Sequence, residues 1–223
     1  MQFFLDTGSL EEIRTASRWG LLDGVTTNPS LVGKEGMDHR ALIREIASIT
    51  SGPISVETTS EVAEEMVTQG REYATWAPNV YVKVPCTQEG IRAASLLGQQ
   101  GIRINVTLVF SVNQSILAAK VGAAFVSPFV GRLDDIGQDG MAVVREMVQV
   151  YRIQRYTTKV LAASLRHPMH VTQAALAGAD IATVPFRVLE QLVKHPLTEL
   201  GQERFLSDWR KLQTDLERKK TKV

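Results

Sequence analysis

The sequence predicts a single domain of the (β/α)8 barrel class, followed by an additional C-terminal helix. Eight short runs rich in β-branched and aromatic residues alternate with segments in which apolar residues recur at helical spacing. Parallel strands need helical crossovers, and closure into a barrel removes the exposed edges of the sheet. A length of 223 residues suits one such barrel better than two smaller domains.

The eight predicted strands are spread over most of the chain. They are Gln2–Asp6, Gly24–Thr27, Ile54–Thr58, Val80–Pro85, Arg103–Thr107, Ala124–Phe129, Lys159–Ala163 and Asp180–Val184. A doubly wound open sheet is the alternative, but such sheets usually have fewer strands and a glycine-rich first turn. The first turn here, Asp6-Thr7-Gly8-Ser9, lacks that pattern, which favours the barrel.

Segments with helical spacing separate the strands. The clearest are Glu61–Trp76, Gln88–Gln100, Asn113–Val121 and Gly140–Arg155. Glycine often ends a helix because it adopts the left-handed conformation without strain. The glycines placed as such end signals are Gly20, Gly70, Gly101, Gly122 and Gly178.

One domain is predicted over residues 1–223, with the barrel at about 1–195 and a helical extension at about 196–219. Apolar residues of the extension fall close to helical spacing, namely Leu200, Phe205, Trp209, Leu212 and Leu216. A helix with this pattern buries its apolar side against another surface. The sequence leaves open whether Trp209 packs on its own barrel or on a neighbouring subunit.

The composition argues against several classes of partner. The 25 basic and 24 acidic residues leave a net charge of +1, which gives no electrostatic footprint for nucleic acid or an anionic membrane. Cys86 is the only cysteine, so an intramolecular disulfide and a cysteine-based zinc site are excluded. The first residues lack the pattern of a signal peptide, and no apolar run is long enough to span a membrane. We therefore expect a cytoplasmic protein.

Polar residues gather at the carboxyl ends of the predicted strands, where barrel enzymes hold their catalytic groups. Residues two apart on a strand share a face, so these side chains are expected to converge. The strand-end residues are Asp6, Thr26, Asn28, Glu57, Lys83, Asn105, Thr107, Ser127, Phe129, Ser164 and Arg166. The alternative interpretation is a solvated barrel rim with structural hydrogen bonds and no chemistry.

Lys83 is the most informative of these residues, because it interrupts the apolar strand Val80–Pro85. If Val82 and Val84 face the helices, Lys83 faces the barrel interior. Burial of a lysine disfavours its charged form, and the uncharged amine is the form that attacks a carbonyl. The alternative is a buried ion pair with Glu57 or Asp6, although arginine is the commoner choice for such a pair.

An amine nucleophile needs groups that carry protons. Carboxylates at Asp6 and Glu57 are suited to the loss of water during Schiff-base formation and to removal of a hydroxyl proton during carbon–carbon cleavage. For Asp6 the alternative is a cap on the helix that follows the first strand. For Glu57, at the end of a strand, a helix cap is less plausible.

Six segments, taken together and in order, resemble the transaldolase family, specifically the short subgroup that also contains the fructose-6-phosphate aldolases. They are Leu5-Asp6-Thr7, Gly24-Val25-Thr26-Thr27-Asn28-Pro29-Ser30, Val82-Lys83-Val84-Pro85, Asn105-Val106-Thr107-Leu108-Val109-Phe110-Ser111, Ser127-Pro128-Phe129-Val130-Gly131-Arg132 and Leu161-Ala162-Ala163-Ser164-Leu165-Arg166. Any single segment is weak support. All six fall in register with the predicted strands.

The resemblance implies a catalytic role for four residues. Lys83 would form the Schiff base, and Asp6 would act as acid and base on the substrate hydroxyl during carbon–carbon cleavage. Glu57 would act through a water molecule held by Thr107 during formation and hydrolysis of the imine. No metal ion and no organic cofactor are implied.

The resemblance also implies the groups that bind the substrate, a sugar phosphate. Asn28 and Asn105 would contact its hydroxyl groups, with Thr26 and Ser127 in support. The phosphate would be held by Arg132, Ser164 and Arg166, since guanidinium groups suit phosphate oxygens. For Arg132 the alternative is a salt bridge to Asp134 or Asp135. Arg187, after the eighth predicted strand, is a further candidate that the resemblance does not carry over.

The implied activity is that of a transaldolase of the pentose phosphate pathway. Such an enzyme moves a dihydroxyacetone unit from sedoheptulose 7-phosphate to glyceraldehyde 3-phosphate, giving erythrose 4-phosphate and fructose 6-phosphate. The related aldolases release free dihydroxyacetone and have Gln and Tyr where this chain has Glu57 and Phe129, so transaldolase is favoured. The third hypothesis is a barrel that binds sugar phosphate without turnover. The resemblance to the short subgroup also implies a ring-shaped homo-oligomer, either a pentamer or a decamer.

Overall fold

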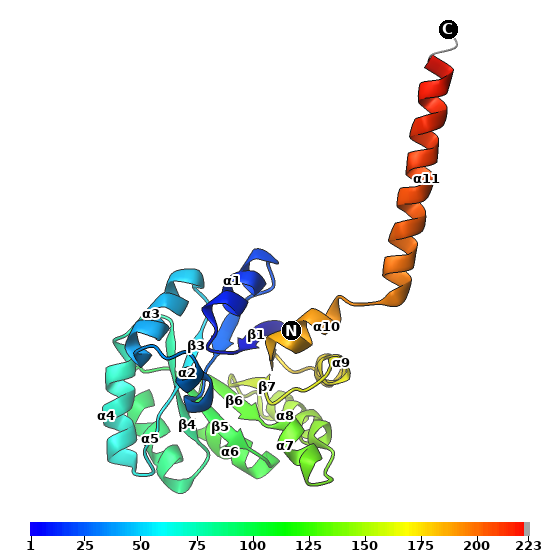
Figure 1. Cartoon of the computed structure of the whole chain (residues 1–223). Coiled ribbons are helices and arrows are strands. Elements are labelled where there is room, and N and C mark those ends of the chain that lie inside the picture. Colours follow the sequence, from blue (N-terminus) through cyan, green and yellow to red (C-terminus); the bar gives the residue numbers. More distant parts are fainter. Residues whose placement is uncertain (221–223) are drawn as a thin grey trace. The chain divides into compact units, whose positions relative to one another are not determined.

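The computed structural model describes residues 1–220 and confirms the predicted barrel. Eight parallel strands close on themselves in sequence order, with β1 paired to both β2 and β8 (Figure 1). The strands are β1 (Gln2–Asp6), β2 (Gly24–Thr26), β3 (Ile54–Glu57), β4 (Val80–Pro85), β5 (Ile104–Val109), β6 (Phe125–Pro128), β7 (Lys159–Ala162) and β8 (Ile181–Val184). Every predicted strand is present.

Helices follow the strands, and those between consecutive strands lie around the ring (Figure 1). They are α1 (Leu10–Arg18), α2 (Pro29–Lys34), α3 (His39–Ile49), α4 (Ala63–Ala74), α5 (Gln88–Gly98), α6 (Val112–Lys120), α7 (Val130–Asp135), α8 (Gly140–Gln154), α9 (Pro168–Ala177), α10 (Phe186–Leu192) and α11 (Pro196–Lys220). Side-chain caps begin several of them, since Ser9, Thr87 and Ser111 each accept a hydrogen bond from a backbone N–H in the first turn.

Four of the five predicted glycine end signals follow a helix in the left-handed conformation: Gly20, Gly101, Gly122 and Gly178. The prediction for Gly70 is wrong, because Gly70 lies inside α4. A Cβ atom there would meet Leu97 Cδ1 at 2.8 Å and Val82 Cγ1 at 3.1 Å. The glycine at this position therefore permits close packing of α4 against its neighbours and does not end it.

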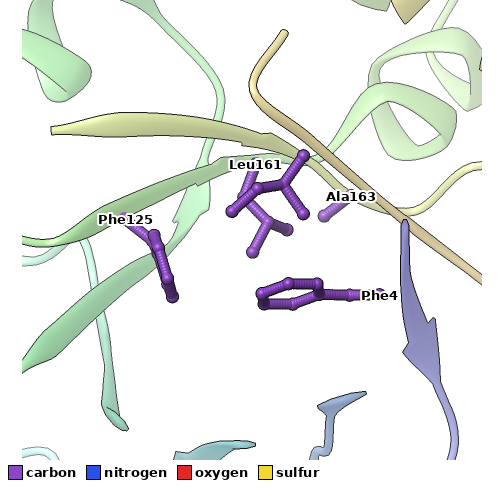
Figure 2. Packing of buried hydrophobic residues seen from close by; sticks show 5 residues of the cluster. Phe4, Phe125, Leu161 and Ala163 are labelled. Atoms are coloured by element: carbon purple, nitrogen blue, oxygen red, sulfur yellow. The ribbon is translucent and has the colours of Figure 1, made fainter. Parts of the chain in front are cut away.

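The interior of the barrel has an apolar layer toward the amino ends of its strands. Phe4, Phe125, Leu161 and Ile181 pack together there with Ala163, which follows the end of β7, and Figure 2 shows the rings of Phe4 and Phe125 close together and steeply inclined to each other. These two rings meet edge to face with centroids 5.8 Å apart. The layer fills the bottom of the barrel, as expected for a packed core that is not a pore.

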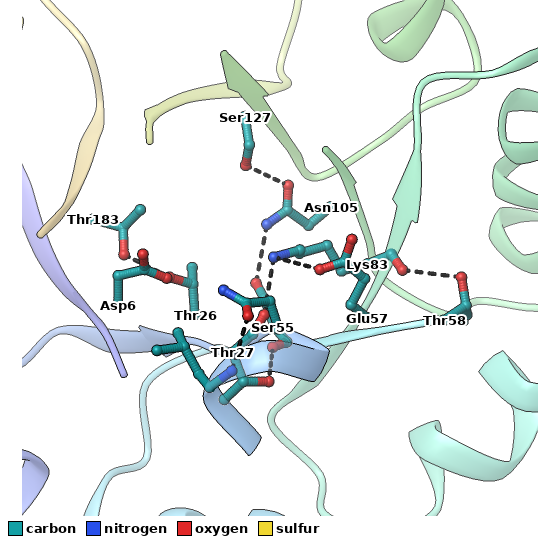
Figure 3. A network of polar contacts seen from close by, with 12 residues as sticks. Asp6, Thr26, Thr27, Ser55, Glu57, Thr58, Lys83, Asn105, Ser127 and Thr183 are labelled. Carbon is teal, nitrogen blue, oxygen red and sulfur yellow. Dashed lines mark hydrogen bonds and ion pairs between the residues drawn. The ribbon is translucent and has the colours of Figure 1, made fainter. Parts of the chain in front are cut away.

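A polar layer lies directly above the apolar one, because inward-facing residues recur every two positions along a strand. Phe4 is followed by Asp6 on β1, and Phe125 is followed by Ser127 on β6. The inward residues at this level are Asp6, Thr26, Glu57, Lys83, Asn105, Ser127 and Thr183 (Figure 3). Strand alternation alone thus delivers polar groups from seven strands to the carboxyl-terminal mouth of the barrel.

Strand β5 runs two residues beyond the predicted end at Thr107. Its register with β6 shifts between Val106 and Val109, and Leu108 has a φ of 55°. This irregularity is a β-bulge, a feature that bends a strand and re-aims side chains beside active sites. Leu108 lines a pocket at the mouth of the barrel.

The chain divides into two compact units, Met1–Leu189 and Glu190–Val223. The division falls within α10, somewhat before the predicted end of the barrel. The predicted C-terminal helix is present as α11, which carries exposed apolar side chains that include Leu200, Phe205 and Trp209. Over the described residues, no helix combines the length and apolar character that crossing a membrane requires.

Candidate active site

Lys83 lies inside the barrel with only 4% of its surface exposed. Its Nζ atom donates a hydrogen bond to the backbone carbonyl of Thr27 at 2.9 Å and forms an ion pair with Glu57 Oε2 at 3.0 Å (Figure 3). The strand register explains the pair, because Glu57 on β3 is the direct partner of Lys83 on β4. The ion pair and the inward-facing lysine, which the sequence presented as alternatives, therefore occur together.

A cavity of about 130 Å³ opens beside this lysine, so the amine has space in which to meet a substrate. Its lining consists of Asp6, Thr26, Asn28, Lys83, Asn105, Thr107, Ser127, Phe129, Arg132, Leu161, Ala163, Ser164 and Thr183. A second hollow of about 360 Å³ shares Asp6, Asn28, Lys83, Phe129 and Arg132 with it and adds Glu57. All but one of the predicted site residues line one of these two spaces.

Asp6 faces the cavity from β1 and does not cap a helix. Its Oδ1 accepts a hydrogen bond from the hydroxyl of Thr26 at 2.9 Å, whereas Ser9 caps α1. Burial raises the pKa of Asp6, and the positive charge of Lys83 and the hydrogen bond from Thr26 offset part of that rise. A carboxylate with a raised pKa beside a cavity is well suited to accept and return a proton.

Three buried side chains near Lys83 form a hydrogen-bonded row, and one of them, Asn105, is the direct strand partner of Lys83. The hydroxyl of Ser127 donates to Asn105 Oδ1 at 2.7 Å, and Asn105 Nδ2 donates to Ser55 Oγ at 3.0 Å (Figure 3). The row fixes the orientation of the Asn105 amide and leaves its second N–H for a ligand in the cavity. Ser55 was not among the predicted residues, although it lies two positions before Glu57 and therefore on the same face of β3.

Thr107 is fully buried and lines the cavity, and within the described part of the chain its hydroxyl has no hydrogen-bond partner. Buried hydroxyl groups are rarely left without a partner. A hydroxyl that faces a cavity in this state is able to hold a small polar molecule such as water.

Asn28 caps a helix and also lines the cavity. Its side-chain oxygen caps α2 by accepting a hydrogen bond from the N–H of Leu31 at 3.0 Å. Because that contact uses only Oδ1, the amide nitrogen remains for the cavity that Asn28 also lines. The cap holds the amide in place, so that it is oriented before a ligand arrives.

The two predicted phosphate-binding arginines differ in position. Arg132 lines both spaces, with its guanidinium carbon 5.0 Å from the ring centroid of Phe129. Asp135 forms its salt bridge with Arg166 and Asp134 contacts His170, so the described residues show neither alternative salt bridge of Arg132, although its charge acts on Asp135. Both terminal nitrogens of Arg166 contact that carboxylate, and this bond lowers the pKa of Asp135. The structure therefore brings Arg132 to the cavity and leaves Arg166 outside its lining.

The turn that carries Ser164 is tightly fitted. Ser164 has a φ of 58°, unusual for a residue other than glycine, and its carbonyl accepts a hydrogen bond from the N–H of Gly131 at 3.1 Å. A Cβ atom on Gly131 would lie 2.5 Å from that same carbonyl oxygen. The glycine thus allows the start of α7 to approach the Ser164 backbone closely, which sets the Ser164 side chain in the cavity wall.

Cys86, next to the lysine strand, is a packing residue in this structure. Its sulfur contacts the carbonyl of Gln114 at 3.7 Å, and burial raises the pKa of the thiol to about 11. At neutral pH the thiol is therefore protonated and a poor nucleophile.

Over residues 1–220, no group of three or more His, Cys, Asp or Glu side chains is placed to hold a metal ion. The site consists of one amine, two carboxylates, the guanidinium group of Arg132 and a set of neutral hydrogen-bonding groups. A barrel enzyme with a buried lysine flanked by acids beside a polar cavity is the class that this fold and site define.

Comparisons with known proteins place the chain within that class. The family model described as Transaldolase/Fructose-6-phosphate aldolase matches residues 3–223. The chain is 62% identical over 211 residues to a protein named probable transaldolase from Roseiflexus sp. (strain RS-1), a match covering 94% of this chain and 97% of that relative. The chain therefore belongs to the transaldolase/fructose-6-phosphate aldolase family and is an enzyme of the transaldolase type.

Two further likenesses agree with the fold and the family. A probable transaldolase from Heliobacterium modesticaldum (strain ATCC 51547 / Ice1) is 58% identical over 209 residues, covering 94% of this chain and 97% of the relative. Among solved structures, a thiamine phosphate pyrophosphorylase from Pyrococcus furiosus superposes with a TM-score of 0.58 at 15% identity, covering 86% of this chain and 93% of that one. That likeness concerns the barrel fold alone.

Proposed function

We propose that the enzyme transfers a dihydroxyacetone unit between sugar phosphates through a Schiff base on Lys83, in the pentose phosphate pathway. The observation that carries the proposal is the position of the Lys83 amine, buried in the barrel, 3.0 Å from a carboxylate and open to a cavity. Sedoheptulose 7-phosphate is the proposed donor and glyceraldehyde 3-phosphate the proposed acceptor.

In the first step Glu57 accepts the proton that Lys83 shares with it, and the free amine attacks the C2 carbonyl of the ketose. A carbinolamine forms, and loss of its hydroxyl group as water gives the imine. Glu57 returns the proton that this departure requires, acting through a water molecule held by Thr107 in the cavity. The short ion-pair distance and the unpartnered Thr107 hydroxyl support these roles.

In the second step Asp6 removes the proton from the C4 hydroxyl of the bound sugar. The C3–C4 bond breaks, its electron pair moves toward the imine to form an enamine, and the aldose phosphate leaves. Asp6 is suited to this task because burial raises its pKa and because it lines the cavity opposite Lys83. Asn28 and Asn105 would orient the hydroxyl groups of the three-carbon unit.

In the third step the acceptor aldehyde enters, C3 of the enamine attacks its carbonyl carbon, and Asp6 gives its proton to the new hydroxyl group. Hydrolysis of the imine then releases the product and restores Lys83. Arg132 and Ser164 would bind the phosphate of donor and acceptor at one end of the cavity. Thr26 and Ser127 support Asp6 and Asn105 through their hydrogen bonds.

The test is transfer activity measured for Lys83→Met and for Lys159→Met. Lys159, which begins β7, is exposed and serves as the matched control. We expect Lys83→Met to lose transfer entirely and Lys159→Met to retain it. Full transfer activity in the Lys83 variant would refute the Schiff base on Lys83, and a wild type that binds sugar phosphate without any transfer would support the barrel without turnover.

Release of free dihydroxyacetone is the second candidate activity, and the identity of residue 129 bears on it. The Phe129 ring lines the cavity and has no hydroxyl with which to assist water or discharge the enamine. The intermediate would therefore wait for an acceptor aldehyde. Phe129→Tyr is expected to raise the ratio of dihydroxyacetone release to transfer with fructose 6-phosphate, and an unchanged ratio would contradict this role.

We also propose that the enzyme is a cytoplasmic homo-oligomer, a pentamer or decamer, that binds neither nucleic acid nor membranes. The near-zero net charge and the exposed apolar side chains of α11, including Phe205 and Trp209, support this assignment. Native mass spectrometry of the purified chain should give a single closed assembly. A monomer at micromolar concentration would exclude it.

A further inference from the structure

Thr183 on β8 is a buried residue of the cavity wall to which neither the sequence nor the family resemblance gave a role. It is only 2% exposed and lines the same cavity as Lys83. Its hydroxyl oxygen lies 2.6 Å from that of Thr26, and Thr26 in turn contacts Asp6 (Figure 3). Three neighbouring strands, β8, β1 and β2, are thus joined by one hydrogen-bonded row.

The direction of the hydrogen bonds follows from proton counting. A hydroxyl group has one proton to donate, and an ionised carboxylate has none. Thr26 donates its proton to Asp6 Oδ1 at 2.9 Å, so between the two threonines the donor must be Thr183. When Asp6 is ionised, the row therefore runs from Thr183 to Thr26 to Asp6.

This direction matters for the charge on Asp6. A hydroxyl that receives a hydrogen bond becomes a stronger donor, and a bond that ends on a charged acceptor is stronger than one between neutral groups. Loss of the Thr183 hydroxyl therefore destabilises the ionised form of Asp6 more than the protonated form. The short 2.6 Å contact is consistent with a strongly polarised pair.

Other charged groups also act on Asp6, and they stay constant when Thr183 changes. Lys83 on β4 favours the ionised form and Glu57 on β3 opposes it. Arg132 of α7 shares the cavity. The remaining ionisable groups, which line a neighbouring pocket that also includes Asp6, are Glu12, Lys34, Glu35 and Arg187. None of these charged groups lies on β8. On that strand, Thr183 is the residue that acts on the ionisation of Asp6, through its hydrogen bond with Thr26.

We propose that Thr183 is a positioning residue for carbon–carbon cleavage: its hydroxyl, acting through Thr26, holds the Asp6 carboxylate in the orientation and charge state that accept the substrate proton. The proposal rests on the proposed role of Asp6. It adds β8 to the strands that support the site, since the family resemblance gave no role to a side chain of that strand.

The test compares Thr183→Val, which keeps the shape and removes the hydroxyl, with Thr183→Ser, which keeps the hydroxyl. Thr158→Val is the matched control, because Thr158 is also buried and its hydroxyl also makes one hydrogen bond, to the carbonyl of Ala123 at the amino end of β7. Transfer rates are measured against pH, and the Asp6 carboxyl is titrated by carbon-13 NMR in the protein without substrate.

In Thr183→Val we expect the pKa of Asp6 to rise and the acid limb of the pH–rate profile to move to higher pH. On the acid limb the rate should fall by roughly three- to tenfold, the loss expected for one hydrogen bond, with a smaller change on the plateau. Thr183→Ser should restore the wild-type profile, and Thr158→Val should not differ from the wild type.

An acid limb and an Asp6 titration that stay in place in Thr183→Val overturn the proposal, as does an equal shift in Thr158→Val. If Thr183→Val does not fold, Thr183→Ala provides the same titration. Borohydride trapping at Lys83 separates this result from failure of the proposed function. A wild type that traps no adduct refutes the Schiff base, whereas the titration of Asp6 still reports on Thr183.

Discussion

Lys83 is held by two contacts that fix it without closing it off. The ion pair with Glu57 and the bond to the Thr27 carbonyl restrain the amine, while the cavity beside it stays open. A buried ion pair is weak evidence for stability, because desolvation cancels much of the attraction. Next to a cavity the same pair has a chemical use, since Glu57 is placed to accept the proton that must leave before the amine reacts.

The buried carboxyl group of Asp6 is expected to lower the stability of the protein while it serves the reaction. Burial raises its pKa, so the folded protein binds a proton there more tightly than the unfolded chain. Stability is therefore lost as the pH rises from the usual range of aspartate to the raised folded value, and it stays lower above that value. Asp6→Asn removes this cost at neutral pH.

We expect Asp6→Asn to lose transfer activity and to gain about 1 kcal/mol of stability at neutral pH, or about 2–4 °C in Tm. The gain should disappear below the usual range of aspartate, where the wild-type carboxyl is also neutral. Thermal unfolding at both pH values measures the effect. Glu64→Gln is the control, because Glu64 is exposed and its pKa is lowered by hydrogen bonds to the backbone and Arg92, so its neutralisation should bring no gain. A destabilised Asp6→Asn at neutral pH would contradict the account.

The two arginines at the carboxyl-terminal mouth of the barrel are expected to contribute unequally to phosphate binding. Arg132 lies in the cavity wall, whereas the guanidinium of Arg166 is bound to Asp135. Arg132→Ala should raise KM for the phosphorylated acceptor roughly 10- to 100-fold, as expected for loss of charge-assisted hydrogen bonds. Arg166→Ala should have a smaller effect, below about tenfold.

Steady-state kinetics with glyceraldehyde 3-phosphate and with unphosphorylated glyceraldehyde checks the assignment. The Arg132 variant should differ from the wild type with the first acceptor only. A larger effect of Arg166→Ala than of Arg132→Ala would show that the ion pair with Asp135 opens to the phosphate and that Arg166 is the main ligand.

Single elements of the barrel were well predicted where a repeating pattern sets them. Alternation along β4 put Lys83 inside, and the same rule on β3 placed Glu57 beside it. The bulge at Leu108 and the positive φ of Ser164 had no such signal, because neither residue is a glycine. The contact between Arg166 and Asp135 joins two elements far apart in sequence, and no local pattern reports that pairing.

Thr183 shows a second limit of sequence interpretation. In Ile181-Ala182-Thr183-Val184 a threonine is an ordinary strand residue, since it is β-branched and packs well in sheets. Only the closure of the barrel, which pairs β8 with β1, brings its hydroxyl to Thr26. Ser55 escaped notice for a related reason, because its partner Asn105 lies on β5, two strands further along the ring.

The junction between the start of α7 and the end of β7 predicts the effect of a glycine substitution. In Gly131→Ala the new Cβ would meet the Ser164 carbonyl oxygen at 2.5 Å, so one of the two segments must move. We expect a loss of about 1–3 kcal/mol in stability and a raised KM for phosphorylated substrates, since Ser164 lies in the cavity wall.

Urea unfolding and steady-state kinetics measure these two effects. Gly33→Ala in α2 is the control, because nothing lies within 4 Å of its Cβ position. Wild-type stability and KM in the Gly131 variant would mean that the junction tolerates the shift.

At the scale of the whole molecule, the barrel class and the C-terminal helix followed from the sequence because eight strand runs with helical crossovers admit few other folds. The boundary was less well defined, since α10 continues the helical pattern across the division at Leu189. That the two units form one domain stays a prediction. The apolar residues of α11 predict an assembled enzyme, but a single chain carries no count of subunits.

The proposed activity depends on one covalent bond, formed between the buried amine of Lys83 and a ketose. The direct test is reduction with borohydride in the presence of fructose 6-phosphate, followed by peptide mass spectrometry. We expect one dihydroxyacetone-sized adduct on the peptide that contains Lys83, and none on Lys34 or Lys159. An adduct on a different lysine, or the absence of any adduct while transfer proceeds, would contradict it.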